Sequence, residues 1–187
     1  MILFSAPSGC GKTTIVDRLL KRHPDWVRSV SATTRPPRVG EKEGKDYFFL
    51  SARAFKQMQS SGELLELARV FGHDYGTPKA FVLDCLKEGK NVILAIDVQG
   101  ADQVRKVGEL KDSTLTFFVL PPSVKVLRER LEGRKTESPA QIQRRIEAAQ
   151  EEIKAARLYD HAIVNQNLDK TIFRIEECVE KFQKKRR

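Results

Sequence analysis

The chain has 187 residues, of which 40% are hydrophobic and 32% are charged with both signs mixed, so it favours one main folded domain and argues against disorder. The net charge is +9, and the positive charge is concentrated in two segments. Residues 1–60 have 11 basic and 5 acidic side chains, and residues 121–150 have 7 basic and 4 acidic side chains. These basic residues cluster around Gly, Ser and Thr rather than aromatic residues. A small polyanion such as a nucleotide phosphate therefore fits them better than nucleic acid does.

The sequence also limits the compartment in which we expect the chain to work. No apolar run approaches the roughly 20 residues that cross a bilayer, and the few residues before the first motif are too short for a signal peptide. Cys10, Cys85 and Cys178 are widely spaced and form no CxxC pair, which argues against a disulfide framework and against a zinc site. We therefore expect a reducing, cytoplasmic setting without membrane contact. The basic tail 184–187 predicts a solvated helix end, with contact to an anionic partner as the alternative.

Short apolar runs alternate with helical patterns along the chain. The predicted strands are 2–4, 47–50, 64–67, 91–97, 114–120 and 161–164. The predicted helices run from about Lys12 to His23, from Ser51 to Gly62, from Thr77 to Gly89, from Ser123 onward, from Ser138 through Ala156, and over 172–182. In the third of these helices we expect Thr77 to be the N-cap and Pro78 to occupy the first helical position. The nearly all-apolar runs 91–97 and 114–120 are typical of strands buried on both faces. The pattern predicts an α/β fold with a parallel sheet, into which the strand-rich, polar segment 31–76 is inserted as a lobe.

A phosphate-binding motif lies between the first strand and the first helix. It comprises Ala6, Pro7, Ser8, Gly9, Cys10, Gly11, Lys12 and Thr13, and it matches G-x-x-x-x-G-K-[ST] except that Ala6 replaces the first glycine. Backbone N–H groups and the helix N-terminus can cradle a phosphate there, Lys12 supplies a charge between the terminal phosphates, and Thr13 supplies a hydroxyl for Mg²⁺. We expect Gly9 and Gly11 to adopt conformations closed to other residues. We interpret Cys10 as a passive residue of this loop.

From this loop onward the chain resembles guanylate kinases over nearly its whole length. The matching segments are 5–12, Ser31-Ala32-Thr33-Thr34-Arg35-Pro36-Pro37-Arg38-Val39-Gly40-Glu41, 44–47, 74–77, 96–100, 121–123 and 130–134. The resemblance implies a P-loop NTPase-type parallel sheet flanked by helices, with a mixed α/β GMP-binding lobe and a helical lid. It implies Mg²⁺-dependent phosphoryl transfer from ATP to GMP, giving ADP and GDP. It places the core in 1–30, 84–122 and 156–187, the GMP-binding lobe in 31–83 and the lid in 123–155.

The resemblance also assigns residues to a GMP site. Arg35, Arg38, Tyr47 and Tyr75 match residues that hold the GMP phosphate, and guanidinium groups suit phosphate oxygens. Ser31, Glu66, Thr77 and Asp97 match contacts to the base. A carboxylate such as that of Glu66, an acid within an apolar strand, can accept both N–H donors on the guanine edge, which adenine lacks. The sequence leaves open whether Thr77 is a ligand or a helix cap. It also leaves open whether Asp97 contacts the base or Mg²⁺ through water, because Ala95 stands where some family members have a second aspartate.

The ATP side is assigned in the same way. Arg130, Arg134 and Arg145 match arginines that surround the donor phosphates, with surface ion pairs to nearby glutamates as the alternative. Thr14 extends the phosphate loop, and Asn165 matches a position near adenine. The resemblance therefore gives Lys12, Arg35, Arg130, Arg134 and Arg145 as catalytic residues. The reaction needs no general base, because the attacking GMP oxygen is already ionised.

Two other functions remain open at this stage. Guanylate-kinase-like domains of scaffolding proteins have no activity and bind peptides, although intact Lys12 and Thr13 argue against that class here. The chain could also phosphorylate a different acceptor, which the segment from Ser31 to Glu41 argues against.

Overall fold

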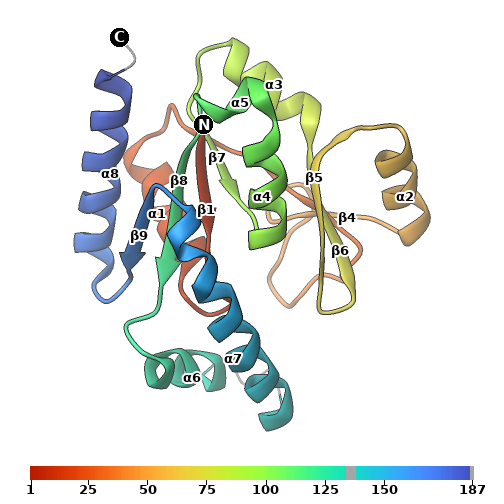
Figure 1. The fold of residues 1–187 in the computed structure, drawn as a ribbon. Coiled ribbons are helices and arrows are strands. Elements are labelled where there is room, and N and C mark those ends of the chain that lie inside the picture. Colours follow the sequence, from red (N-terminus) through yellow and green to blue (C-terminus); the bar gives the residue numbers. More distant parts are fainter. Residues whose placement is uncertain (134–137, 186–187) are drawn as a thin grey trace. The chain divides into compact units, whose positions relative to one another are not determined.

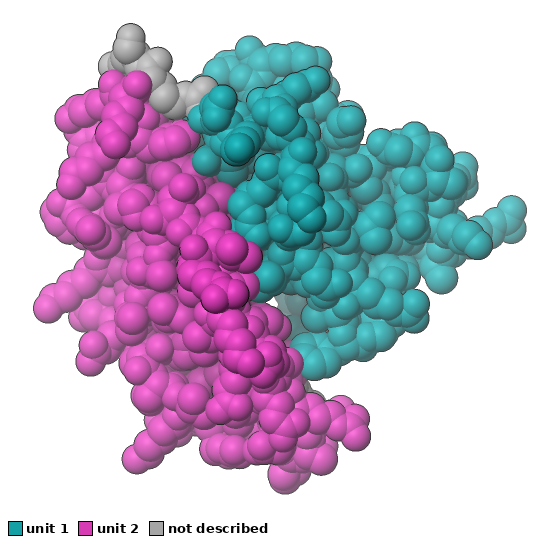
Figure 2. Space-filling view, viewed as in Figure 1, with its two compact units in different colours: residues 1, 25–114 teal, residues 2–24, 115–187 magenta. Residues whose placement is uncertain are grey.

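The computed structural model describes residues 1–133 and 138–185, and its chain divides into two compact units (Figures 1 and 2). The first unit comprises residue 1 and residues 25–114, and the second comprises residues 2–24 and 115–187. The segment that the sequence suggests as an insertion thus belongs to the first unit, and the phosphate loop belongs to the second.

The second unit is built on three parallel strands, β1 (Ile2–Ser5), β8 (Leu115–Leu120) and β9 (His161–Val164), with β8 paired to both of the others. All four residues of β1 are buried, and Phe4 stacks on Phe117 of β8 with ring centroids 5.1 Å apart. Because the strands are parallel, their carboxyl ends lie at one edge. The loop after β1 and the loop after β9 therefore both start from that edge, where ligand sites of α/β sheets form.

Helices of the second unit begin and end where the sequence provides caps. They are α1 (Lys12–Arg22), α6 (Val124–Glu132), α7 (Pro139–Ile153), the 3₁₀ turn η1 (Lys154–Leu158) and α8 (Leu168–Lys184). The Ser123 side chain caps α6, and Ser138 caps α7 in a capping box with Gln141. These starts confirm the sequence prediction, but α7 ends at Ile153 and continues only as η1 through the predicted Ala156.

The first unit contains a four-stranded mixed sheet in the order β4 (Phe48–Phe49), β3 (Ala32–Thr33), β6 (His73–Pro78) and β5 (Leu64–Val70). Helix α2 (Ala52–Ser60) lies between β4 and β5 in the chain and is capped by Ser51, as predicted. The β5–β6 pairing carries a register shift between Leu64 and Glu66. Through this bulge the neighbouring residues Leu65 and Glu66 are both buried, which a regular strand does not allow on a half-exposed sheet.

The first unit also holds a parallel pair of strands, β2 (Val27–Arg28) and β7 (Val92–Ala95). Its other helices are α3 (Lys79–Lys87), α4 (Val98–Lys106) and α5 (Gly108–Lys111). Figure 1 shows α4 directly after β7 in the chain, with the two running in opposite directions.

Three local predictions were wrong in detail. Thr77 does not cap α3: Thr77 and Pro78 end β6, Pro78 occupies the cap position, and the helix begins at Lys79. The strand predicted over 91–97 ends at Ala95, because the Asp97 side chain caps α4, a helix that the sequence analysis did not predict. The strand predicted over 47–50 is limited to Phe48–Phe49.

The predicted fold class is confirmed. The chain is an α/β protein with parallel strands flanked by helices, a separate mixed sheet with its own helix, and the helix pair α6 and α7. Within residues 1–133 and 138–185, no helix combines the length and the hydrophobicity that a membrane crossing requires.

Candidate active site

The phosphate loop of the second unit has the backbone that its sequence predicts. Gly9 and Gly11 have φ angles of 93° and 89°, and α1 begins directly after them at Lys12. A Cβ at Gly9 would lie 2.9 Å from Leu127 of α6, and a Cβ at Gly11 would lie 2.6 Å from the side-chain nitrogen of Asn165. Both glycines are therefore required by conformation and by packing. The first-turn residues Thr13 and Thr14 are exposed, at the positive end of the helix.

Asn165, just beyond β9, holds this loop by a hydrogen bond from its buried side chain. Its Nδ2 donates to the carbonyl oxygen of Cys10 at 2.9 Å, and its Oδ1 accepts from Thr171 at 3.3 Å. Its backbone N–H donates to Leu120 at 2.8 Å, and only 7% of the residue is exposed. The structure thus gives Asn165 a role in holding the loop, and the predicted contact with adenine stays a prediction.

Two of the predicted lid arginines point back onto this region of the second unit. Arg145 of α7 donates to the Ser8 hydroxyl at 2.8 Å, and Arg130 of α6 donates to the Asn165 carbonyl at 3.0 Å. Both side chains are half-buried. Arg134, the third predicted arginine, lies outside the described residues. One guanidinium group therefore lies against the phosphate loop and a second against Asn165, while Lys12 begins α1 directly after the loop.

A second group of predicted residues surrounds Arg35 in the first unit. Arg35 is 9% exposed and donates to both carboxylate oxygens of Glu41 at 2.8 and 2.9 Å, to the Tyr75 hydroxyl at 3.2 Å and to the Pro36 carbonyl at 2.7 Å. Burial lowers the pKa of Arg35, but the bonds to Glu41 and Tyr75 outweigh it and raise the pKa above its ordinary value. The guanidinium is held charged and in one orientation, as an anion site requires.

Tyr47 and Tyr75 flank this guanidinium. The two rings lie 5.9 Å apart at 70°, and the Arg35 guanidinium lies 5.3 Å from the Tyr47 ring centroid. Desolvation, and secondarily the neighbouring Tyr75, raises the pKa of Tyr47, so its hydroxyl keeps its proton and can donate to an anion. Arg38 is exposed; its backbone N–H donates to Glu41 at 2.7 Å.

The predicted base-reading residues lie in the same unit. Glu66 of β5 is 3% exposed, and its Oε1 accepts a hydrogen bond of 2.7 Å from Thr77 of β6, the residue opposite it in the sheet. A carboxylate that is buried in this way needs hydrogen-bond donors, and Thr77 supplies one of them. Asp97 is half-buried; it accepts from the Gly100 N–H at 2.9 Å and from Gln99 at 3.1 Å. Ser31 is half-buried next to β3.

The comparisons with known proteins agree with this geometry. The family model described as guanylate kinase matches residues 1–182. The chain belongs to the guanylate kinase family. It is similar to guanylate kinase from Wolbachia sp. subsp. Brugia malayi (strain TRS), with 42% identity over 100% of this chain and 94% of that protein. It is also similar to guanylate kinase from Clostridioides difficile (strain 630), with 43% identity over 96% of this chain and 86% of that protein.

Solved structures lead to the same family. A crystal structure of guanylate kinase from Anaplasma phagocytophilum covers 97% of this chain, with the chain spanning 84% of it, at a TM-score of 0.81 and 34% identity. A crystal structure of shikimate kinase from Bacteroides thetaiotaomicron is similar in fold alone. It matches with 13% identity and a TM-score of 0.54, over 96% of this chain and 97% of that one. These matches confirm the resemblance seen in the sequence, and none favours a non-catalytic module or another acceptor.

One residue of this guanylate kinase family site was missed as a functional group. Glu41 appeared only within the matching segment, although it accepts bonds from both the Arg35 side chain and the Arg38 backbone. It is the only acid in the basic run 31–41, and that isolation was the available signal.

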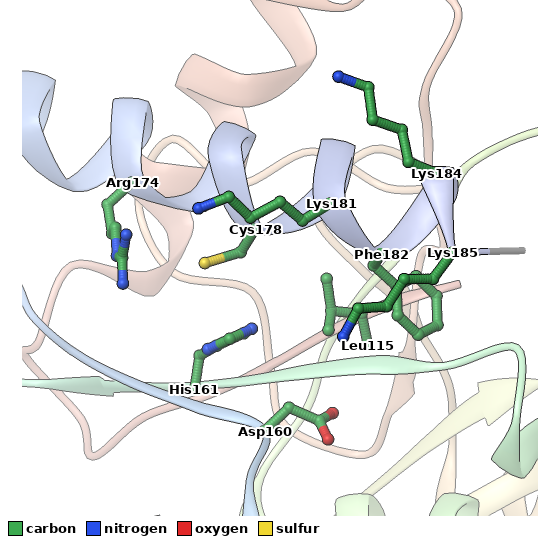
Figure 3. Close-up of a pocket in the computed structure, with 9 residues that line it drawn as sticks. All are labelled: Leu115, Asp160, His161, Arg174, Cys178, Lys181, Phe182, Lys184 and Lys185. Atoms are coloured by element: carbon green, nitrogen blue, oxygen red, sulfur yellow. The ribbon is translucent and has the colours of Figure 1, made fainter.

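A cavity of about 550 Å³ in the second unit is lined by none of the predicted site residues (Figure 3). It is lined by Leu115, Asp160, His161, Arg174, Cys178, Lys181, Phe182, Lys184 and Lys185. Leu115 and His161 are the first residues of β8 and β9, so the cavity lies at the strand ends opposite to the phosphate loop. Its Arg174 and Lys184 have glutamate partners, Glu177 at 3.3 Å and Glu180 at 2.6 Å, which reduces its positive charge.

The donor set at the phosphate loop suits Mg²⁺. Thr13 offers a hydroxyl oxygen, and Mg²⁺ prefers oxygen ligands that include nucleotide phosphates and water. In the described part of the chain no group of three or more His, Cys, Asp or Glu side chains could hold a metal ion.

Proposed function

We propose that this chain transfers the γ-phosphoryl group of ATP to GMP, giving ADP and GDP, in a Mg²⁺-dependent reaction. The observation that carries the proposal is the buried Glu66 carboxylate with Thr77 bonded to one oxygen. A buried acceptor of this kind rewards a ligand that presents adjacent N–H donors, as guanine does, and penalises one that does not.

ATP binds the second unit. Its phosphates lie against the loop Ala6–Thr14, with backbone N–H groups, the α1 N-terminus and Lys12 offsetting their charge. Arg130 and Arg145 approach the same phosphates from α6 and α7, and Arg134 belongs to the same group of lid arginines. We assign Asn165 first to holding the loop and secondarily to the adenine side.

GMP binds the first unit. Arg35, Arg38, Tyr47 and Tyr75 hold its phosphate, and Glu66, Asp97, Ser31 and Thr77 contact its base. Glu41 orients Arg35 before GMP arrives, because both carboxylate oxygens engage the same guanidinium nitrogen. The domain boundaries that we propose are those of the sequence analysis, with core 1–30, 84–122 and 156–187, lobe 31–83 and lid 123–155.

In the reaction an ionised phosphate oxygen of GMP forms a bond to the γ-phosphorus of ATP, and the bond from that phosphorus to the β–γ bridging oxygen breaks. ADP leaves with the electron pair of that bond. No proton has to be removed first, so positioning and charge stabilisation are the contributions of the protein. Lys12 and the arginines stabilise the negative charge that spreads over the transferring group.

Mg²⁺ supplies charge neutralisation on the ATP phosphates when it is bound. Thr13 is the residue that we expect to hold it, with Asp97 as a candidate partner through water. We propose a cytoplasmic setting, since Cys10, Cys85 and Cys178 are buried free thiols that suit a reducing compartment.

An acceptor panel tests the function. ADP release is followed with ATP, Mg²⁺ and GMP, dGMP, AMP, CMP or UMP as acceptor. We expect kcat/KM for GMP to exceed that for AMP by about 10⁴-fold, as in other sites built on buried hydrogen bonds. Equal rates with GMP and AMP, or no ADP release with GMP, would contradict the proposal.

A further inference from the structure

Gly100, the third residue of α4, lies where the Glu66 side chain needs room. A Cβ placed on Gly100 would lie 2.8 Å from Cδ and 3.3 Å from Cγ of Glu66, and closer still to Oε2. Real Cβ atoms essentially never approach another atom within 3.0 Å, so the carboxylate occupies the volume that any other residue at this position would fill.

Neither helix formation nor backbone conformation explains a glycine at this position. Glycine is the poorest helix former after proline, and alanine would serve α4 better. Gly100 does not have a positive φ, unlike Gly9 or Gly11. The remaining explanation is space, and the occupant of that space is Glu66.

The slot cannot widen easily, because hydrogen bonds from α4 residues before and after Gly100 tie the helix to β5. Gln103 of α4 accepts from the Leu67 N–H at 3.1 Å, and Gln99 donates to the Arg69 carbonyl at 3.3 Å. Gly100 also fixes the second acid, since its N–H donates to Asp97 at 2.9 Å. This backbone bond would remain with alanine at position 100, so only the space for Glu66 depends on the glycine.

We infer that Gly100 is a positioning residue for guanine recognition: its missing side chain lets the Glu66 carboxylate lie against the first turn of α4, with one oxygen bonded to Thr77, in the place where it meets the base. The inference rests on the proposed GMP kinase function. The N-terminus of α4 also favours the Glu66 carboxylate in this place, because the positive end of a helix dipole stabilises a negative charge.

Gly100→Ala tests this role against a matched control. The added methyl group displaces the Glu66 carboxylate, so we expect the KM for GMP to rise about 10- to 100-fold, the effect of losing a charged hydrogen bond or misplacing a ligand by about 1 Å. The KM for ATP should change little, and the overpacking should lower the melting temperature. Gly108→Ala is the control: Gly108 begins α5, has no positive φ, and a Cβ there meets nothing within 4 Å. We expect it to leave both KM values unchanged.

A double-mutant cycle separates positioning from general damage to α4. In the Glu66→Ala background the obstructed group is absent, so Gly100→Ala should alter the KM for GMP by no more than about twofold. A full, additive loss in that background would overturn the inference, and so would an unchanged KM in the single variant. If Gly100→Ala does not fold, Glu66→Ala should restore its melting temperature, and failure to do so would contradict the contact.

Wild-type protein in the same titration distinguishes the two proposals. If the wild type does not phosphorylate GMP, the proposed function fails. If the wild type phosphorylates GMP and the Gly100→Ala protein has the same KM for GMP, only the positioning role fails.

Discussion

Asn165→Asp replaces the side-chain amide that donates to the phosphate loop by a carboxyl group of the same shape, whose oxygen accepts instead. The Asn165 amide donates to the Cys10 carbonyl at 2.9 Å in an environment where only 7% of the residue is exposed. An ionised carboxylate in that place would face the carbonyl oxygen with negative charge and no donor. A protonated one could donate, and burial raises the pKa of an introduced carboxyl.

The size of the effect follows from the lost bond. Leaving a buried acceptor without its donor costs about 1–3 kcal/mol, which corresponds to a fall in melting temperature of about 2–12 °C for a chain of this length. Because the pKa of the introduced carboxyl is raised, the loss is greatest above that pKa and diminishes as the pH falls through it. Displacement of the loop should raise the KM for ATP about 10- to 100-fold while the KM for GMP changes little.

The assay combines melting curves from pH 5 to pH 8 with ATP titrations at saturating GMP. Thr171→Val is the matched control, since it removes only the longer 3.3 Å bond to the other end of the same amide and should have a smaller effect. A melting temperature and an ATP KM equal to those of the wild type would refute the role of Asn165 in holding the loop.

Four further outcomes follow from the same structure. Lys12→Ala should lower kcat by at least about 100-fold, as measured by ADP release. Arg35→Lys should raise the KM for GMP at least about tenfold, because an ammonium cannot reach Glu41, Tyr75 and a phosphate together. Glu176→Gln should lower the melting temperature at pH 7, and the difference from the wild type should shrink as the pH falls. Burial raises the Glu176 pKa, yet the bonds with Arg22 and His23 outweigh burial and lower the pKa. This stabilisation is therefore present above the unfolded pKa and is lost as the pH falls through the folded pKa. Removing Mg²⁺ with a chelator should abolish turnover while the melting temperature without nucleotide stays the same.

Local chemistry explains which features the sequence could predict. The phosphate loop is contiguous, so strand, glycines, lysine and helix appear in order within residues 2–22, and the structure has them so. The caps Ser51, Ser123 and Ser138 are also local signals, and all three hold.

Long-range partners explain what the sequence could not predict. Thr77 followed by proline has the local features of a helix cap, yet its hydroxyl bonds to Glu66, 11 residues earlier and across the sheet. Helix α4 was missed because its buried positions Gly100, Ala101 and Val104 are mostly small and give little hydrophobic signal. The two-residue strands β2 and β3 are too short for any periodicity.

The most direct test of this account is a crystal structure of the chain with GMP and a non-hydrolysable ATP analogue. We expect both guanine N–H donors to meet the Glu66 carboxylate, the GMP phosphate to meet Arg35, and the analogue's phosphates to lie in the loop Ala6–Thr14. Guanine bound away from Glu66, or a side chain filling the space beside that carboxylate, would contradict it.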